Sequence, residues 1–132
     1  MKLVTRDADY AIRAVCYIAA QKKKIVPVKE LVKCMGIPHS FLRKLLQKLN
    51  KEGMLKSHKG KGGGFTLPVA PKSMTVGDLL EVFQGRIRLN EHTFRKKPCP
   101  NIKYCKLKKR LDVIEQRTIA ELKSITIGSL IK

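Results

Sequence analysis

The first half of the chain contains three stretches in which apolar residues recur every three or four positions, the spacing of a helix with one buried face. The first stretch covers residues 9–20. The second begins after Pro27, which a helix tolerates at its start, and stops at Gly36. The third covers about residues 40–50 and has a stripe of leucines at positions 42, 45, 46 and 49. We therefore expect three short helices, with a tight turn at 35–38 between the last two.

Two short strand-like segments follow, separated by a run of glycines. Residues 54–57 and 65–67 are expected to pair as strands, and Gly53 ends the preceding helix. The turn between them reads Lys-Gly-Lys-Gly-Gly-Gly. Pro68 and Pro71 end the hairpin, because proline cannot donate to a strand ladder.

The second half of the chain predicts two more helices around an irregular segment. Thr75 and Asp78 match a capping box for a helix that Gly85 ends. Residues 86–104 show no period and are expected to form a loop. A long helix is expected over residues 106–123. Its narrow, mostly apolar stripe is typical of two helices packed along their length. It consists of Leu107, Leu111, Ile114, Thr118, Leu122 and Ile125. Thr126 is expected to cap a final turn that docks Leu130 and Ile131. The predicted fold is mainly α with a small β-hairpin.

The charge of the chain points to a polyanionic partner. Its 132 residues include 29 basic and 10 acidic ones, which gives a formal net charge of +19. Seven basic residues lie in 43–61 and ten in 86–110, each block with a single acid. Such blocks can steer a protein onto a phosphate backbone, although a general lysine bias for solubility is the alternative for 86–110. With no tryptophan and 5% aromatic residues, stacking platforms for single strands are not expected.

The expected location is the cytoplasm. The longest apolar run, residues 14–20, is too short to span a membrane, and the start of the chain lacks the pattern of a signal peptide. Four cysteines, two of them in apolar helical patterns, do not resemble a secreted disulfide framework. We expect Cys16 and Cys34 to be core residues.

The two helices around Gly36 match a helix-turn-helix. In this motif the second helix presents its polar face and N-terminal residues to the major groove. In this chain those residues are His39, Ser40, Arg43, Lys44, Gln47 and Lys48. Arg43 suits guanine and Gln47 suits adenine, because each can form paired hydrogen bonds with that base. Lys44 and Lys48 are expected to hold phosphates.

The glycine-rich hairpin is expected to act as a wing beside that helix. Gly62 and Gly63 allow the backbone to approach a duplex closely, while Lys59 and Lys61 reach a phosphate or the minor groove. His58, like His39, is interpreted as a hydrogen bonder beside DNA, with a pH switch as the alternative.

Other functions fit the sequence less well. The glycine run lacks the spacing of a nucleotide-phosphate loop and does not precede a helix. An enzyme is not expected, because the chain has no Cys-x-x-Cys, paired carboxylates or Walker motif. A nucleic-acid binder without a regulatory role, architectural or RNA-associated, and a winged helix that binds protein stay open as alternatives.

Three stretches of sequence resemble the Rrf-two family of bacterial transcription regulators. They are the opening residues 1–14, Gly36-Ile37-Pro38 with the leucine-rich helix, and the wing 59–67. The resemblance covers nearly the whole chain. It implies a homodimeric repressor whose two winged helices bind a pseudo-palindromic operator in double-stranded DNA. The implied division is a winged helix-turn-helix domain at 1–85, a sensor loop at 86–105, and a dimerisation helix with a final turn at 106–132.

This chain departs from the family pattern at several positions. The family wing usually reads Arg-Gly-Pro-Gly-Gly-Gly, whereas Lys59 replaces the arginine here and Lys61 the proline. Arg43 stands where some members have glutamate, so we expect a different operator preference.

The resemblance also raises the possibility of an iron–sulfur cluster, either 2Fe-2S or 4Fe-4S. Cluster-binding relatives carry three cysteines in the sensor loop, but this chain has only Cys99 and Cys105. His92 can replace the third ligand, since imidazole also serves iron, and Asp9 of the partner subunit matches the fourth. The alternatives are a redox-switching disulfide, another metal, or no ligand, with control by a protein partner or a small molecule.

Overall fold

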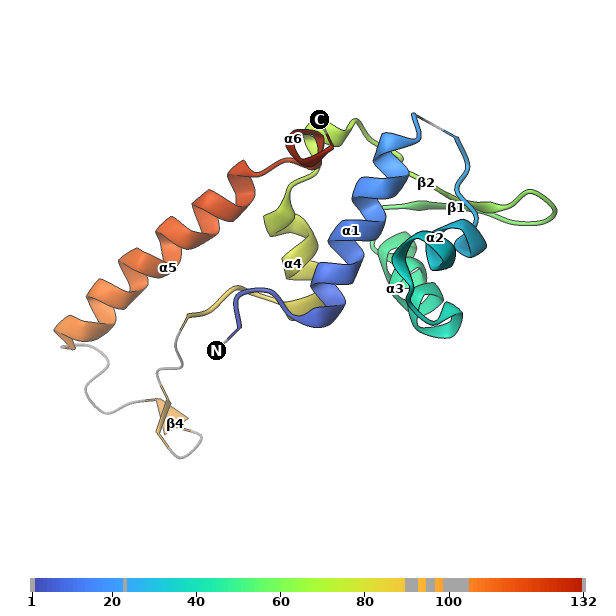
Figure 1. Cartoon of the computed structure of the whole chain (residues 1–132). Helices are drawn as coiled ribbons and strands as arrows, with labels where there is room; N and C mark the ends of the chain where they lie inside the picture. The colour runs from blue at the N-terminus through green and yellow to red at the C-terminus, as the bar shows by residue number, and fades with distance from the viewer. Residues whose placement is uncertain (1, 23, 90–92, 95–96, 99–104, 132) are drawn as a thin grey trace.

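The computed structural model describes residues 2–22, 24–89, 93–94, 97–98 and 105–131. Helix α1 runs through the middle of the body, with α2 and α3 on one side and α4 on the other, while α5 extends away from it (Figure 1). The helices are α1 (Arg6–Ala20), α2 (Val28–Met35), α3 (His39–Lys51), α4 (Val76–Gln84), α5 (Lys106–Ser124) and α6 (Ile127–Leu130). A short 3-10 helix, η1, covers Pro71–Ser73.

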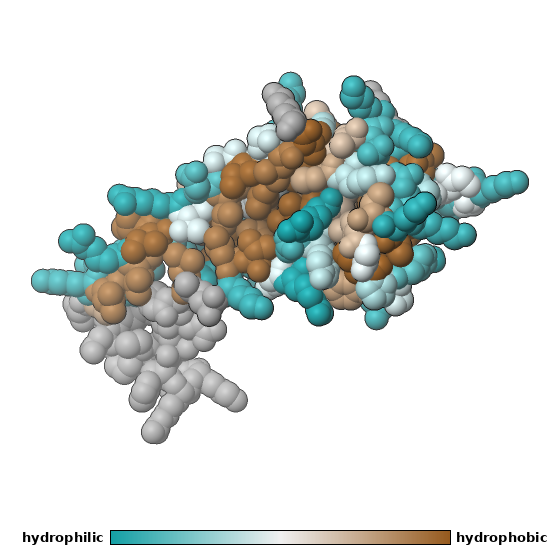
Figure 2. Space-filling view, in the orientation of Figure 1, coloured by the Kyte–Doolittle hydropathy of each residue, from teal (hydrophilic) through white to brown (hydrophobic). Residues whose placement is uncertain are grey.

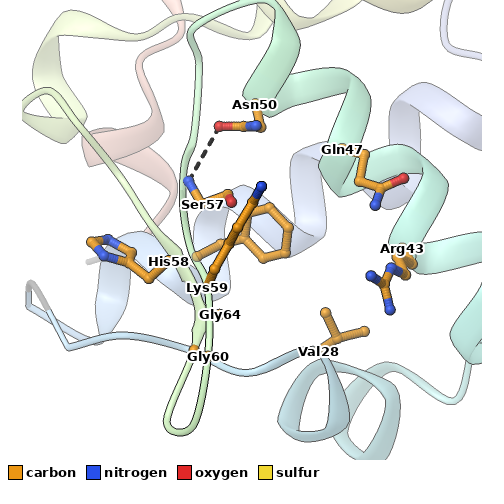
Figure 3. A pocket seen from close by; sticks show the side chains of 11 residues that line it. Val28, Arg43, Gln47, Asn50, Ser57, His58, Lys59, Gly60 and Gly64 are labelled. Atoms are coloured by element: carbon orange, nitrogen blue, oxygen red, sulfur yellow. Dashed lines mark hydrogen bonds between the residues drawn. The ribbon is translucent and has the colours of Figure 1, made fainter.

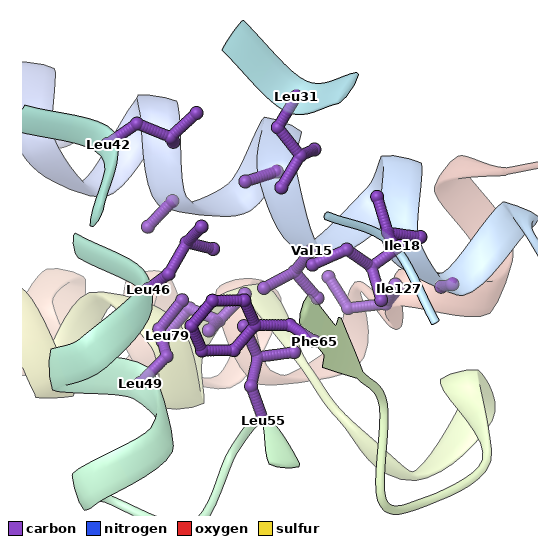
Figure 4. Packing of buried hydrophobic residues seen from close by; sticks show 14 of the residues in the cluster. Val15, Ile18, Leu31, Leu42, Leu46, Leu49, Leu55, Phe65, Leu79 and Ile127 are labelled. Atoms are coloured by element: carbon purple, nitrogen blue, oxygen red, sulfur yellow. The ribbon is translucent and has the colours of Figure 1, made fainter. Parts of the chain in front are cut away.

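Helix α1 is the centre of the core. Thr5 caps it by accepting a hydrogen bond from the backbone N–H of Ala8. Its fully buried face is made largely of alanines, at positions 8, 11 and 14, which allow neighbouring helices to approach closely. Larger side chains from the other elements fill the space around it, among them Leu31, Leu46, Leu79 and Ile127 (Figure 4).

The predicted helix-turn-helix is confirmed. Helix α2 ends at Gly36, which adopts a left-handed φ of 67° that favours glycine. Ile37 is buried in the turn, and Pro38 precedes the first residue of α3. The four leucines of the α3 stripe are all buried, as their spacing predicts. Burial of this stripe turns the polar side of α3 outward.

The hairpin forms, but its strands differ from the predicted ranges. Strand β1 (Lys56–His58) pairs antiparallel with β2 (Gly64–Thr66), with Ser57 opposite Phe65. The prediction that the first strand begins at residue 54 is wrong. The backbone N–H groups of Met54 and Leu55 both donate to the carbonyl of Leu49, and this wraps them around the end of α3.

The second half of the chain largely follows the prediction. Thr75 and Asp78 form the expected capping box of α4, and Thr126 caps α6 through the N–H of Ser129. The prediction that Leu130 docks is wrong, because Leu130 is 47% exposed and Ile127 fills the core position instead. Ile131 does pack against the core.

The segment 86–104 is not entirely a loop. Within it β3 (Thr93–Phe94) pairs antiparallel with β4 (Lys97–Pro98). A pair of two-residue strands is too short to produce an alternating sequence pattern, and Pro98 argues against a strand. His92 and Cys99 lie outside the described residues.

Among the described residues, it is the C-terminal half of α5 that packs on the rest of the chain. Leu122 is buried there, and Lys123 forms a 3.0 Å ion pair with Glu81 of α4. Toward its N-terminus α5 leaves large apolar side chains in solvent: Leu107 is 65% exposed and Ile114 50%. Apolar surface therefore extends along α5 (Figure 2). No helix within the described ranges is both long enough and apolar enough to cross a membrane.

Candidate nucleic-acid interface

An open groove lies between α3 and the wing, which we define as β1, β2 and the turn 59–63. Its volume is about 690 Å³. Arg43 and Gln47, one turn apart on α3, line one side, and Lys59 and Gly60 of the wing line the other (Figure 3). The groove is therefore lined by side chains that can form hydrogen bonds, by the charged Lys59 and by glycine backbone without side chains.

The polar face of α3 is open to solvent. All six residues predicted to face DNA are exposed, namely His39, Ser40, Arg43, Lys44, Gln47 and Lys48. Lys48 has a contact within the chain, because its Nζ lies 5.2 Å from the centre of the Phe83 ring. This cation–π contact draws Lys48 toward α4. The other five have no such contact among the described interactions and remain available to a ligand.

The wing tip requires glycine for two reasons. Gly60 and Gly62 have left-handed φ values of 89° and 78°. At Gly63 a Cβ atom would lie 2.3 Å from the carbonyl oxygen of His58, so a side chain does not fit. The exposed Lys59 and Lys61 thus sit on a narrow turn whose shape depends on its glycines. His58 lies inside the hairpin, where Nε2 hydrogen-bonds Thr66 Oγ1 at 2.9 Å.

Asn50 is a site residue that sequence reasoning missed. Its Oδ1 accepts a hydrogen bond of 3.2 Å from the backbone N–H of Ser57, which ties the last turn of α3 to the first strand of the wing (Figure 3). This bond helps set the angle between the two walls of the groove. No sequence pattern marks it, because an asparagine near a helix end has many possible partners.

A second missed feature holds the other end of α3. The Arg6 guanidinium lies 5.2 Å from the centre of the Phe41 ring, and Phe41 meets Tyr10 edge to face at 5.9 Å. These contacts join the beginning of α1 to the first turn of α3. They also place a cation next to the residues predicted to enter the major groove.

The predicted cluster ligands are only partly described. Cys105 is half-buried at the N-cap of α5, where its Sγ accepts a 3.4 Å hydrogen bond from the backbone N–H of Lys108. Asp9 is held by Arg13, whose Nε lies 3.1 and 3.2 Å from the two carboxylate oxygens. Within the ranges that can be described, no three His, Cys, Asp or Glu side chains come together as a metal site.

The other two cysteines differ from each other. Cys16 is half-buried, and burial raises the pKa of its thiol. The prediction that Cys34 is a core residue is wrong, because it lies on the exposed side of α2. It lies close to Tyr17, which donates a 2.7 Å hydrogen bond to Glu30 Oε2, and this bond raises the pKa of the Tyr17 phenol.

A family model described as "Rrf2: Iron-dependent Transcriptional regulator" matches residues 4–132. Among curated relatives, a protein of Aquifex aeolicus (strain VF5) described as an HTH-type transcriptional regulator is 39% identical over 74 residues. That match covers 56% of this chain and 51% of the relative, about half of its length. The regulator NsrR of Shouchella clausii (strain KSM-K16) is 29% identical over 129 residues, covering 90% of this chain and 87% of that protein.

The fold also matches a solved structure over nearly its full length. CymR, the global cysteine regulator of B. subtilis, superposes with a TM-score of 0.76 at 21% identity. The superposition covers 99% of this chain and 97% of that one. At this identity the likeness establishes the winged-helix fold and its long C-terminal helix.

Proposed function

The chain belongs to the Rrf2 family of DNA-binding transcription regulators, which are not enzymes, and on that basis we propose that it is a homodimeric repressor of a pseudo-palindromic operator. In this proposal residues 1–85 bind DNA, 86–105 sense a signal and 106–132 dimerise. The observation that carries it is the open groove in which Arg43, Gln47 and Lys59 face the same space. Selection of duplexes from a random pool by the full-length protein tests it and should recover inverted repeats.

The residues around the groove are assigned two different roles, contact with base edges and contact with phosphates. We assign base reading to Arg43 and Gln47, which α3 carries on its exposed face. Lys44, with Lys59 and Lys61 at the wing, is assigned to phosphates, which fix the register of the protein on the duplex. The hydrogen bond from Ser57 to Asn50 supports this division, because it keeps the wing at a fixed angle to α3.

The double substitution Lys59→Ala and Lys61→Ala tests the wing. Each lost phosphate contact is expected to lower the slope of log affinity against log salt concentration by about 0.9, so the double variant should lose about two units of slope. Binding titrations at several salt concentrations measure it. Lys72→Ala with Lys109→Ala, two exposed lysines of η1 and α5 that lie outside the helix-turn-helix and the wing, is the control and should leave the slope unchanged. An unchanged slope in the wing variant would remove the wing from the interface.

The exposed apolar stripe of α5 supports dimerisation. Leu107, Ile114 and, toward the body, Leu122 recur at the spacing of a helix that packs along another helix. A two-fold partner would cover the part that the body leaves exposed. Two copies of α3 would then read half-sites about 34 Å apart, one turn of the duplex.

We further propose that the sensor loop controls operator binding through an iron–sulfur cluster or through thiol redox chemistry. Cys99, Cys105 and His92 would hold the cluster together with Asp9 of the partner subunit. Thiolate and imidazole donors suit iron, and a helix N-cap such as that of Cys105 favours a negatively charged ligand. A bound cluster supplies redox and ligand-binding chemistry that the side chains lack.

The structure supports a route from this loop to the dimer helix. The backbone N–H of Leu89 donates a 2.9 Å hydrogen bond to Glu115 Oε1, which ties the start of the loop to the middle of α5. Cys105 caps the same helix at its first turn. We infer that a change of shape in the loop reaches α5 at these two points and alters the spacing of the recognition helices.

The cysteine chemistry has a direct test. Protein purified without oxygen should contain iron and sulfide and absorb visible light, and Cys99→Ser should abolish that absorption. Cys34→Ser is the matched control and should leave it unchanged, because Cys34 lies on the exposed side of α2. Wild-type protein that is colourless and iron-free under these conditions contradicts the cluster and leaves the thiol-redox form of the proposal.

A further inference from the structure

The C-terminal end of α1 lies near α6 and the C-terminus of the chain (Figure 1). Residues at this end of α1 line a second cleft. Its volume is about 640 Å³, which is typical of small-molecule sites. Ile18 of α1, Leu67 and Val69 of the segment that leaves the wing, and Ile131 near the C-terminus contribute its apolar walls. Three segments distant in sequence thus build one apolar recess.

Two cations complete the lining of this cleft. Lys22 and Lys24 line it and are exposed, and no Asp or Glu is among its described lining residues. An apolar wall next to unopposed ammonium groups complements a molecule with an alkyl chain and an anionic head. A purely apolar ligand would make no use of the two lysines.

The backbone conformation of Lys22 is a second indication that this cleft is a functional site. Its φ is +48°, the only left-handed value of a non-glycine residue in the described part of the chain. It lies just beyond the cap residue of α1, a position where helices commonly place glycine because a side chain there is strained. A lysine at this position brings a cation to the cleft at a conformational cost that glycine would avoid. Such cost is often associated with functional sites.

We propose that this cleft binds a small aliphatic carboxylic acid as an effector. Its carboxylate pairs with Lys22 and Lys24, and its alkyl chain packs against Ile18, Leu67 and Val69. No covalent chemistry is involved. The cleft shares none of its described lining residues with the groove between α3 and the wing.

The cleft is connected to the wing by backbone hydrogen bonds. The segment containing Lys24 leads to Val26, and the one containing Leu67 follows Phe65 of β2. Val26 and Phe65 exchange hydrogen bonds of 2.9 and 3.0 Å. A ligand that pulls the two cleft segments together acts on the base of the wing, so ligand and DNA affinities are linked in both directions. This link rests on the proposed DNA-binding function, whereas ligand binding itself does not.

Binding is tested on the full chain without DNA, by calorimetry with hexanoate, octanoate and decanoate below their micelle concentrations. Each pair of added methylenes should raise affinity about tenfold until the cleft is filled, as expected for burial of alkyl groups. Octan-1-ol should bind about fivefold more weakly than octanoate, because it lacks the charge. No saturable binding by any of the acids overturns the proposal, and equal affinity for the alcohol overturns its anionic part.

Variants locate the site. Lys22→Gly with Lys24→Gln should weaken octanoate binding about tenfold without lowering the melting temperature, since glycine relieves the left-handed backbone. Val69→Ser should weaken it several-fold, because it removes part of the apolar wall. Lys29→Gly with Lys33→Gln in α2 changes the same charges elsewhere and should leave octanoate affinity unchanged. Unaltered binding in the cleft variants overturns the site.

The proposed coupling between the cleft and the wing is tested by measuring DNA affinity with and without octanoate. Octanoate should shift the DNA affinity of the wild-type chain, and the Lys22→Gly, Lys24→Gln variant should need about tenfold more octanoate for the same shift. Bound octanoate with unchanged DNA affinity would overturn the link while leaving the site. If the chain bound no DNA at all, the calorimetric result would still stand, so the two failures can be distinguished.

Discussion

Ile114→Asp is expected to convert the dimer to monomers and to weaken operator binding by about a hundredfold or more. Ile114 is half-exposed on the α5 stripe that we assign to the dimer contact. Aspartate there would remove apolar contact area and place two like charges near the two-fold axis, which together cost several kcal/mol. Sedimentation velocity measures the oligomeric state, and DNA titration measures the consequence.

Gln116→Asp provides the control for this experiment. Gln116 is exposed on the same helix but lies two positions from Ile114, about 200° around the axis, so it points away from the stripe. The same charge at this position should leave the dimer intact. Dissociation in the Gln116 variant but not in the Ile114 variant would assign the dimer contact to the opposite face of α5, where Val113 and Ala120 lie.

Arg43→Ala is expected to lower affinity for the selected operator about tenfold to a hundredfold while changing affinity for random duplex far less. A paired hydrogen bond from arginine to guanine contributes about 1–3 kcal/mol of discrimination against the wrong base. Arg43 is exposed on α3 and lines the groove, so its loss should leave folding intact. Competition titrations against operator and random DNA give both affinities.

Lys44→Ala separates base reading from phosphate contact. Lys44 lies next to Arg43 on α3 and is equally exposed, but we assign it to the backbone of the duplex. Its loss should weaken binding to operator and random DNA by the same factor and reduce the salt dependence by about one phosphate. If Arg43→Ala also weakened both by the same factor, Arg43 would be a phosphate contact and the base-reading assignment would fail.

The helices and their ends were predictable because their causes are local. Successive leucines of the α3 stripe are at most three positions apart, and the capping-box residues Thr75 and Asp78 are three positions apart. The structure therefore reproduces both within a residue or two. The wing glycines also follow local rules, since φ values near 80° at Gly60 and Gly62 are open mainly to glycine.

The features that prediction missed depend on how the elements meet in the folded chain, even where the residues are close in sequence. The start of β1 moved because Met54 and Leu55 bind the carbonyl of Leu49. Cys34 shares the apolar spacing of α2, yet its side chain is exposed. The same holds for the bond from Ser57 to Asn50 and for the ring contact of Lys48, which depend on how α3 meets the wing and α4. The spacing of apolar residues along the sequence does not show how two elements pack against each other.

The most direct test of the whole account is selection from a random pool of duplexes, performed in parallel with the wild-type chain and with Arg43→Ala. We predict that the wild-type chain recovers an inverted repeat whose half-site centres are about 10 base pairs apart or a multiple of that. The variant should recover the same spacing with a guanine-containing position relaxed. Recovery of unrelated sequences with no repeat by the wild-type chain would contradict sequence-specific recognition by α3 and would favour a general nucleic-acid binder.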